Sequence, residues 1–465
     1  MADTIAKYSR PVTPSLNDCR MKTPYRTAPV SSTEIPVGIP FIIANEWAER
    51  FSYYGMRAIL VVFMTQYLMD AGGQPAHMSE NEAQGYFHLF VSITYFTPFF
   101  GALIADAWLG KYRTIMLLSL VYCLGHFALA LDSTRLGLLL GQSLIALGAG
   151  GIKPCVSAHV GDQFGAGNRH WLGKVFSWFY LAINLGAFVS MLLIPWLLKT
   201  YGPALAFAVP GVLMLLATGV FWSGRRRFVH IPAAGVGFVR EVLSGEGLRC
   251  LGRLGGIYLF IAMFWALFDQ NGSSWVLQSQ HMDRVVFGVE ILPSQIQAAN
   301  PLLIVLLTPV FHQVVYPALN RVVRVTSIRK IAAGLFVTVL AFALVAWIQG
   351  RIDLGLKPSI LWQLAAYGLL TAAEVMVSIT CLEFSYTQAP RSMKSLVMSL
   401  YMAAVALGNL FTSAVNFLIE NPDGSSRLAG AGYFWFFAAL MLATALGFVC
   451  YGRHYREQVY LQQEA

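Results

Sequence analysis

The residues that could do chemistry are concentrated in one apolar stretch. Residues 46–57 read EWAERFSYYGMR and lie within a run, 37–69, that is otherwise apolar. On an α-helix, side chains three, four, seven, eight and eleven positions apart share one face. This spacing predicts a single stripe of two acids, two bases and two phenols: Glu46, Glu49, Arg50, Tyr53, Tyr54 and Arg57.

Four ionisable groups in a helix of membrane length are costly, at about 2.5–3.5 kcal/mol each on insertion scales. They are tolerated where they face water or one another. The structural alternative is that Glu46 and Glu49 pair with Arg50 merely to neutralise the helix. Such pairs require neither two phenols nor a second base on the same stripe, so we interpret the stripe as functional.

The composition indicates the elements that must position this stripe. Of 465 residues, 57% are hydrophobic and 12% are charged, against about 25% charged in soluble domains. Several windows are apolar over the length of a membrane span. The six cysteines show no paired spacing, so we expect neither a disulfide framework nor a metal site. We predict an all-α integral membrane protein with twelve transmembrane helices, at 37–69, 83–107, 113–131, 136–160, 171–198, 203–223, 254–280, 295–317, 328–349, 359–388, 393–419 and 430–452.

Lysine and arginine are distributed unevenly between the two sides of these spans. The side that holds the N-terminus carries 23 of them and the other side six, which places both termini in the cytoplasm. This asymmetry also explains the net charge of +9 without nucleic acid. The longest polar connection, 224–253, separates six helices from six and leaves no room for two further spans. Two such halves are typical of the major facilitator fold. We expect an N-terminal cytoplasmic tail (1–36), a first bundle (37–223), a cytoplasmic linker (224–253), a second bundle (254–452) and a C-terminal cytoplasmic tail (453–465).

A family resemblance sharpens this interpretation. Glu46-x-x-Glu49-Arg50-Phe51-x-Tyr53-Tyr54-Gly55 resembles the ExxERFxYYG signature of the proton-dependent oligopeptide transporter (POT) family, a branch of the major facilitator superfamily. Further family-like motifs follow in the expected order, and the resemblance covers almost all of residues 46–401. It implies a proton-coupled symporter that imports di- and tripeptides by alternating access, with the peptide bound between the two bundles.

Two other function classes remain to be weighed. A family relative that transports nitrate or another non-peptide anion is the main alternative, but many such members lose part of the ExxER motif, which is complete here. The second alternative is a membrane enzyme or a receptor of a different class, which is less favoured because the spans contain no HExxH, nucleotide loop or nucleophile triad.

The resemblance also implies roles for individual residues. An outer gate is implied for Arg57 with Asp269, and a cytoplasmic gate for Asp106. Glu383 is expected to receive the amino end of the peptide and to pair with Lys153 when no peptide is bound. Proton coupling is implied for Glu46, Glu49, Arg50, His88, Lys153 and Glu383. Peptide binding is implied for Arg50, Tyr53, Tyr54, Tyr95, Lys153, Asn184, Trp265, Asn300, Glu383 and Tyr401.

Several of these roles have structural alternatives. His88, Asn184 and Asn300 could each serve as an ordinary hydrogen-bonding side chain between helices, and Lys153 could reach toward the membrane surface. Glu374 and His312 receive no role from the resemblance.

The expected partners follow from the same interpretation. They are di- and tripeptides, protons as the coupling ion and the lipid bilayer, with no cofactor, metal or nucleic acid. The chain is expected to act as a monomer in the plasma (inner) membrane.

Overall fold

The computed structural model describes residues 25–233, 245–388 and 394–455. Within these residues the chain is almost entirely helical, with one short hairpin, β1 (Val285–Val286) paired antiparallel with β2 (Val289–Glu290). Eleven helical segments there are long and apolar enough to cross a membrane. Helix α1 (Ile39–Gln66), with 28 residues, is also long enough to span a membrane, and it carries the four ionisable residues of the stripe. The twelve predicted spans are therefore confirmed.

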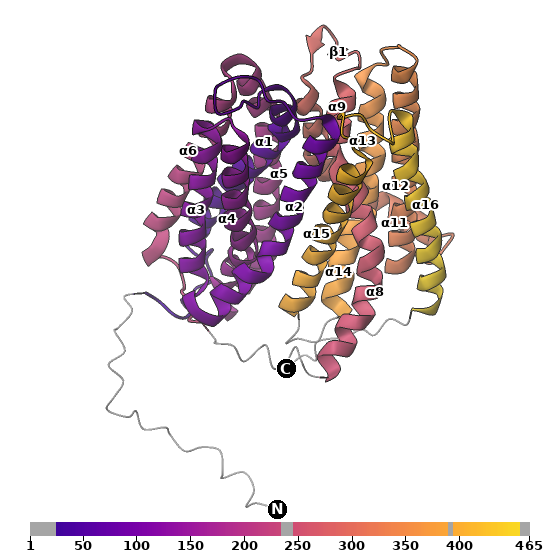
Figure 1. Cartoon of the computed structure of the whole chain (residues 1–465). Coiled ribbons are helices and arrows are strands. Elements are labelled where there is room, and N and C mark those ends of the chain that lie inside the picture. The colour runs from indigo at the N-terminus through magenta and orange to yellow at the C-terminus, as the bar shows by residue number, and fades with distance from the viewer. Residues whose placement is uncertain (1–24, 234–244, 389–393, 456–465) are drawn as a thin grey trace, which may run out of the picture.

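The first six spans form one bundle, drawn in indigo to magenta in Figure 1. After α1 come α2 (Glu80–Ile104), a π-helical turn η1 (Ala105–Leu109), α3 (Lys111–Leu131) and α4 (Arg135–Asp162). The short 3-10 helix η2 (Ala166–Trp171) leads into α5 (Leu172–Tyr201), followed by α6 (Pro203–Ser223) and the 3-10 turn η3 (Gly224–Arg226).

The second six spans form the other bundle, drawn in pink to yellow. Its seventh span is α8 (Gly245–Phe268), η4 (Asp269–Gly272) and α9 (Ser274–Ser279). The eighth is η5 (Pro293–Ala298), α10 (Ala299–Val310), the π turn η6 (Phe311–Val315) and α11 (Tyr316–Asn320). The ninth is α12 (Ser327–Asp353), and the tenth is α13 (Ile360–Glu374), the π turn η7 (Val375–Ile379) and α14 (Thr380–Gln388). The chain closes with α15 (Lys394–Ile419) and α16 (Ala431–His454).

Each bundle has its own apolar core. One buried cluster lies within residues 254–448, and another lies within residues 39–228, to which Val276 and Leu277 of α9 are added. Helix α8 begins at Gly245, inside the segment that the sequence analysis assigned to the linker (224–253). We call the side of the molecule that carries β1–β2 the hairpin face, and the side where α6 ends and α8 begins the linker face (Figure 1).

Local sequence explains the helix boundaries and the close packing that matter for the site. Ser79 caps α2 by accepting a hydrogen bond from the Glu82 amide, and Thr134 caps α4 in the same way at Gly137. Glycines let α2 and α4 approach, because a Cβ added at Gly101 would overlap the backbone of Gly151. This approach brings Lys153 on α4 next to α2.

Candidate functional site

The ExxER stripe forms an ion-paired cluster within α1. The Arg50 Nε lies 2.8 Å from Glu46 Oε1 and 2.7 Å from Glu49 Oε2. All three side chains are buried, and Glu49 is fully inaccessible. The Arg50 Nε donates its hydrogen bond to Glu46, so neither Glu49 oxygen has a hydrogen-bond partner among the described residues, although Oε2 lies within ion-pairing distance. An acid that is only partly compensated is suited to bind a proton.

Lys153 lies between two aromatic rings of the same bundle. Its Nζ is 4.4 Å from the ring centre of Tyr53 on α1 and 4.2 Å from that of Tyr95 on α2. The amine is buried and has no hydrogen-bond partner among the residues that the structure describes. Cation–π contacts of this kind stabilise a desolvated cation, but they leave all three ammonium hydrogens free for an incoming anion.

Arg57 and Asp269 form an ion pair between the bundles, in the hairpin-face half of the molecule. Arg57 NH2 donates to Asp269 Oδ1 at 2.5 Å, and both side chains are buried. Asn409 on α15 donates to the other carboxylate oxygen at 2.7 Å. His88 on α2 contacts Asn409 Oδ1 through Nδ1 and Ser273 Oγ through Nε2, each at 2.8 Å. His88 therefore joins the same group of residues.

Besides Asp269, the second bundle offers a half-buried carboxylate, Glu374. Asn300 on α10 donates to Glu374 Oε2 at 2.7 Å and to Thr371 Oγ1 at 3.2 Å. Glu383 lies nine residues further along the tenth span and is exposed. The π turn η7 lies between the two acids, so their relative orientation does not follow the regular α-helical period. The structure thus brings Glu374, and not Glu383, next to Asn300, and Lys153 contacts aromatic rings rather than Glu383.

The remaining predicted binding residues are distributed over both bundles. Trp265 on α8 packs edge-on against Tyr401 on α15 with 6.4 Å between ring centres, and the Tyr401 hydroxyl is bonded to Ser378 in η7. Asn184 donates to the Tyr180 carbonyl of its own helix, α5, which leaves the amide oxygen available. Tyr54 on α1 packs against the buried cluster of Ala58, Met191 and Ala298, which joins the first bundle to η5 of the second.

The predicted cytoplasmic gate differs in its partners. Asp106 lies in the π turn η1, whereas the base beyond it, Lys111, pairs with Asp162 at the end of α4 at 2.7 Å. That pair lies within the first bundle. His312 is exposed in η6 and donates to the Thr308 carbonyl of its own helix.

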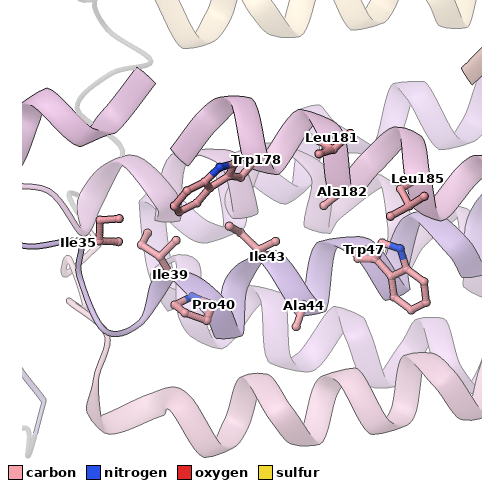
Figure 2. A pocket seen from close by; sticks show the side chains of 10 residues that line it. All are labelled: Ile35, Ile39, Pro40, Ile43, Ala44, Trp47, Trp178, Leu181, Ala182 and Leu185. Carbon is pink, nitrogen blue, oxygen red and sulfur yellow. The ribbon is translucent and has the colours of Figure 1, made fainter. Parts of the chain in front are cut away.

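An apolar pocket lies apart from these charges. It is about 620 Å³ in volume and is bounded by α1 with the residues before it, and by α5 (Figure 2). Ile39, Ile43 and Trp47 face it from α1, and Trp178 and Leu185 from α5. None of the described residues that line it is charged, so it does not fit a zwitterionic ligand.

Sequence reasoning missed four residues of this site. Glu374 was visible as an acid inside a span, a signal that by itself favours function. Asn409, Ser273 and Asp162 gave no signal, because a lone amide, hydroxyl or helix-end acid is common in helical membrane proteins. Among the described residues, no group of three or more His, Cys, Asp or Glu side chains could hold a metal ion.

Comparisons with known proteins agree with this architecture. The model of the POT family matches residues 112–244 and 236–436. Solute carrier family 15 member 2 of Rattus norvegicus is 36% identical over 417 residues, which cover 78% of this chain and 56% of that protein. Peptide transporter family 1 of Drosophila melanogaster is 37% identical over 365 residues, covering 68% and 48%. The chain thus spans about half the length of these two relatives.

Solved structures give the same result for the fold. An auto-inhibited POT family peptide transporter superposes with a TM-score of 0.83 at 37% identity, covering 92% of this chain and 99% of that one. The POT family transporter PepTSo gives a TM-score of 0.83 at 35% identity, covering 90% and 98%. The predicted major facilitator fold is therefore confirmed.

Proposed function

The chain belongs to the POT family, and from this premise we propose that it is a proton-coupled symporter that imports di- and tripeptides by alternating access. The peptide is bound between the bundles, in the half of the molecule nearer the linker face. The transporter acts as a monomer in the plasma membrane with both termini in the cytoplasm, so that the linker face is cytoplasmic. Protons are the coupling ion, and no cofactor takes part.

One observation carries the proposal. Among the residues that the structure describes, Lys153 and Arg50 of the first bundle form no ion pair with the second bundle, which offers the half-buried carboxylate of Glu374. A short peptide has a carboxylate at one end and an ammonium at the other, so it matches this arrangement end to end. Tyr54 lies at the contact between the two bundles and offers a hydroxyl to the peptide backbone.

Within this proposal, Glu374 takes the role that the resemblance gave to Glu383. A bound ammonium requires a carboxylate in a dry environment, where the attraction is not screened by water. Glu374 is half-buried and accepts a hydrogen bond from Asn300, so it is better shielded from water than Glu383, which is exposed. Asn300 then orients the carboxylate for the peptide, and the remaining implied residues, Tyr95, Asn184, Trp265 and Tyr401, form the walls.

Proton coupling is assigned to the group around Arg50. Glu46 and Glu49 share one guanidinium, so protonation of one acid leaves Arg50 better able to bind the peptide carboxylate. The nitrate alternative is less favoured, because a single small anion would need neither Glu374 nor its Asn300 support.

The test is uptake of labelled dialanine into proteoliposomes under an imposed proton gradient. Uptake above the equilibrium level, abolished by a protonophore and unaffected by replacing sodium with potassium, is expected. Full uptake in sodium medium with the proton gradient collapsed would rule out proton coupling. Unlabelled nitrate in excess serves as the control for the anion alternative, because a nitrate carrier would be inhibited by it.

A further inference from the structure

The buried network at the interface of the two bundles contains one residue that no motif singles out. Asn409 on α15 is fully buried and lies between His88 of the first bundle and Asp269 of its own bundle. His88 is also fully buried, and Ser273 lies at its other ring nitrogen. The hydrogen-bonding capacity of these groups decides where protons can be.

The orientation of the Asn409 amide follows from its two acceptors. Its nitrogen donates to Asp269 Oδ2 at 2.7 Å and to the Val405 carbonyl at 3.0 Å. A carboxylate and a carbonyl only accept hydrogen bonds, so the NH₂ group must face them. A flipped amide would place its oxygen against the carboxylate and the carbonyl, which are both acceptors. The hydrogen-bond partners therefore fix the orientation of the amide.

The tautomer of His88 follows from that orientation. With both amide hydrogens used, only Asn409 Oδ1 faces His88, and an amide oxygen can only accept. His88 Nδ1 must then carry a hydrogen and donate it. In neutral His88 the other nitrogen, Nε2, is an acceptor and receives the Ser273 hydroxyl.

We propose that Asn409 is a positioning residue that fixes His88 as the Nδ1–H tautomer, so that an added proton enters at Nε2 beside Ser273. This inference rests on the proposed function for its role in transport, but the tautomer itself does not. When the proton arrives, Nε2 becomes a donor, and Ser273 accepts it by turning its own hydrogen toward the Gln270 carbonyl, 3.5 Å from its Oγ. No bond of His88 has to break in either state.

The same amide connects this proton to the ion pair between the bundles. The charged groups near His88 are Asp269 on η4 and Arg57 on α1, and Asn409 bridges His88 to the first of them. In the neutral state the cluster holds one acid and one base. A proton on His88 adds a second cation to one buried carboxylate, which disfavours the dry, closed arrangement. Asn409 therefore transmits the charge of His88 to the Arg57–Asp269 pair without being charged itself.

The experiment uses the full chain in lipid bilayers, with ¹⁵N-labelled histidine and solid-state NMR. The His88 signals are identified by their loss in His88→Gln. At neutral pH we expect the wild-type protein to show a protonated Nδ1 and an unprotonated Nε2. In Asn409→Leu, Ser273 is the remaining acceptor, so the hydrogen should move to Nε2. A wild-type protein with hydrogen on Nε2, or an Asn409→Leu protein with the wild-type pattern, overturns the proposal.

Two further variants guard against a general loss of structure. Asn416 is a fully buried asparagine on the same helix, bonded to Thr412 and Tyr433 within its own bundle. Asn416→Leu should keep the Nδ1–H tautomer. Ser273→Ala should also keep it, because Asn409 alone sets it; a changed tautomer there contradicts the proposal even if Asn409→Leu does not fold.

Transport measurements separate this inference from the proposed function. In Asn409→Leu, gradient-driven dialanine uptake should fall by about tenfold, the scale of one lost hydrogen bond to a charged group, and its pH profile should flatten. Peptide exchange without a gradient should persist. Absence of peptide transport by the wild-type protein would reject the proposed function and leave the tautomer result standing, whereas unchanged coupled uptake in Asn409→Leu would reject the link to transport.

Discussion

The two halves of the molecule satisfy their buried charges in different ways. In the hairpin-face half, charges are paired between bundles: Arg57 with Asp269, and through Asn409 with His88. Nearer the linker face, charges are satisfied within one bundle. Arg50 pairs with acids of its own helix, Lys153 packs on Tyr53 and Tyr95, and Glu374 bonds to Asn300.

Neutral hydrogen bonds show the same division. Ser413 on α15 donates to the Gly85 carbonyl on α2, and Gln297 in η5 donates to the Ala58 carbonyl on α1. These contacts join the bundles on the hairpin-face side, so the described state is closed there. A partner across the interface closes one half, and the lack of such a partner for Lys153 leaves the other half ready for a ligand.

The largest effect is expected from breaking the Arg57–Asp269 pair. Arg57→Met leaves the buried carboxylate of Asp269 with Asn409 as its remaining partner. This change should lower the stability of the closed state by about 3–5 kcal/mol. The measurement is the distance between spin labels at Tyr201 and Leu354, exposed sites on the hairpin face of each bundle, in a background without cysteines. The label distance should lengthen.

The double variant Arg57→Met/Asp269→Met is the matched control, because it removes both charges together. It should recover most of the closed population, since replacing a whole buried pair with apolar side chains is often nearly neutral. A closed population in the single variant equal to that of the wild-type protein would show that the pair does not hold this half together.

The next effect concerns the acid that receives the peptide. Glu374→Gln should weaken dialanine binding by roughly 10–100-fold, because a hydrogen bond to a charged group is worth about 1.5–3 kcal/mol. The same change at Glu383 removes an exposed charge, for which only a small effect is expected. Calorimetric titration of both variants decides between them, and a larger loss in Glu383→Gln would restore the assignment made from the sequence.

Composition and charge were enough to predict the fold. Apolar windows gave twelve spans, and the predicted boundaries of the third, sixth and eleventh agree closely with Lys111–Leu131, Pro203–Ser223 and Lys394–Ile419. The start of α8 at Gly245 was missed, because glycines and polar residues before Arg253 resemble a linker in the sequence.

The site was predictable where charge was the signal and not where geometry decided. Arg57 and Asp269 were expected to meet, and the structure brings them into contact. Glu383 was preferred over Glu374 by motif matching, although both acids lie on one span and only three-dimensional placement separates them. The π turn η7 begins directly after Glu374 and changes the register between the two acids, an irregularity that helical periodicity does not predict.

A smaller effect is expected from the rings that hold Lys153. Tyr95→Leu removes one of its two aromatic partners while keeping an apolar side chain of similar reach. Losing one cation–π contact should cost about 1–2 kcal/mol at a desolvated site. Peptide affinity should therefore fall by roughly 5–30-fold. Tyr86 on the same helix contacts Phe417 and not Lys153, and Tyr86→Leu serves as the control in the same titration.

The smallest effect is expected at the linker face, where it tests whether a pH-dependent contact there is independent of the hairpin-face half. The segment 25–34 crosses the linker face of the first bundle. His230 N donates to the Arg26 carbonyl, and the His230 ring stacks on Tyr25 with 4.3 Å between centres. Burial among these rings lowers the pKa of His230, which lies outside the spans, so the folded arrangement favours the neutral ring. A histidine whose pKa is lowered in the folded protein stabilises the fold at pH values above the ordinary histidine pKa, near 6.5. That contribution is lost as the pH falls through the lowered pKa.

Below pH 6 the amides around His230 should therefore exchange hydrogen faster. His230→Phe, which keeps the stacking without a titratable group, should remove this pH dependence. Because the contacts of the segment named here lie within the first bundle, the Tyr201–Leu354 label distance in His230→Phe should keep the wild-type pH dependence. A change in that dependence would mean that the two halves are coupled through the linker face, contrary to the division argued above.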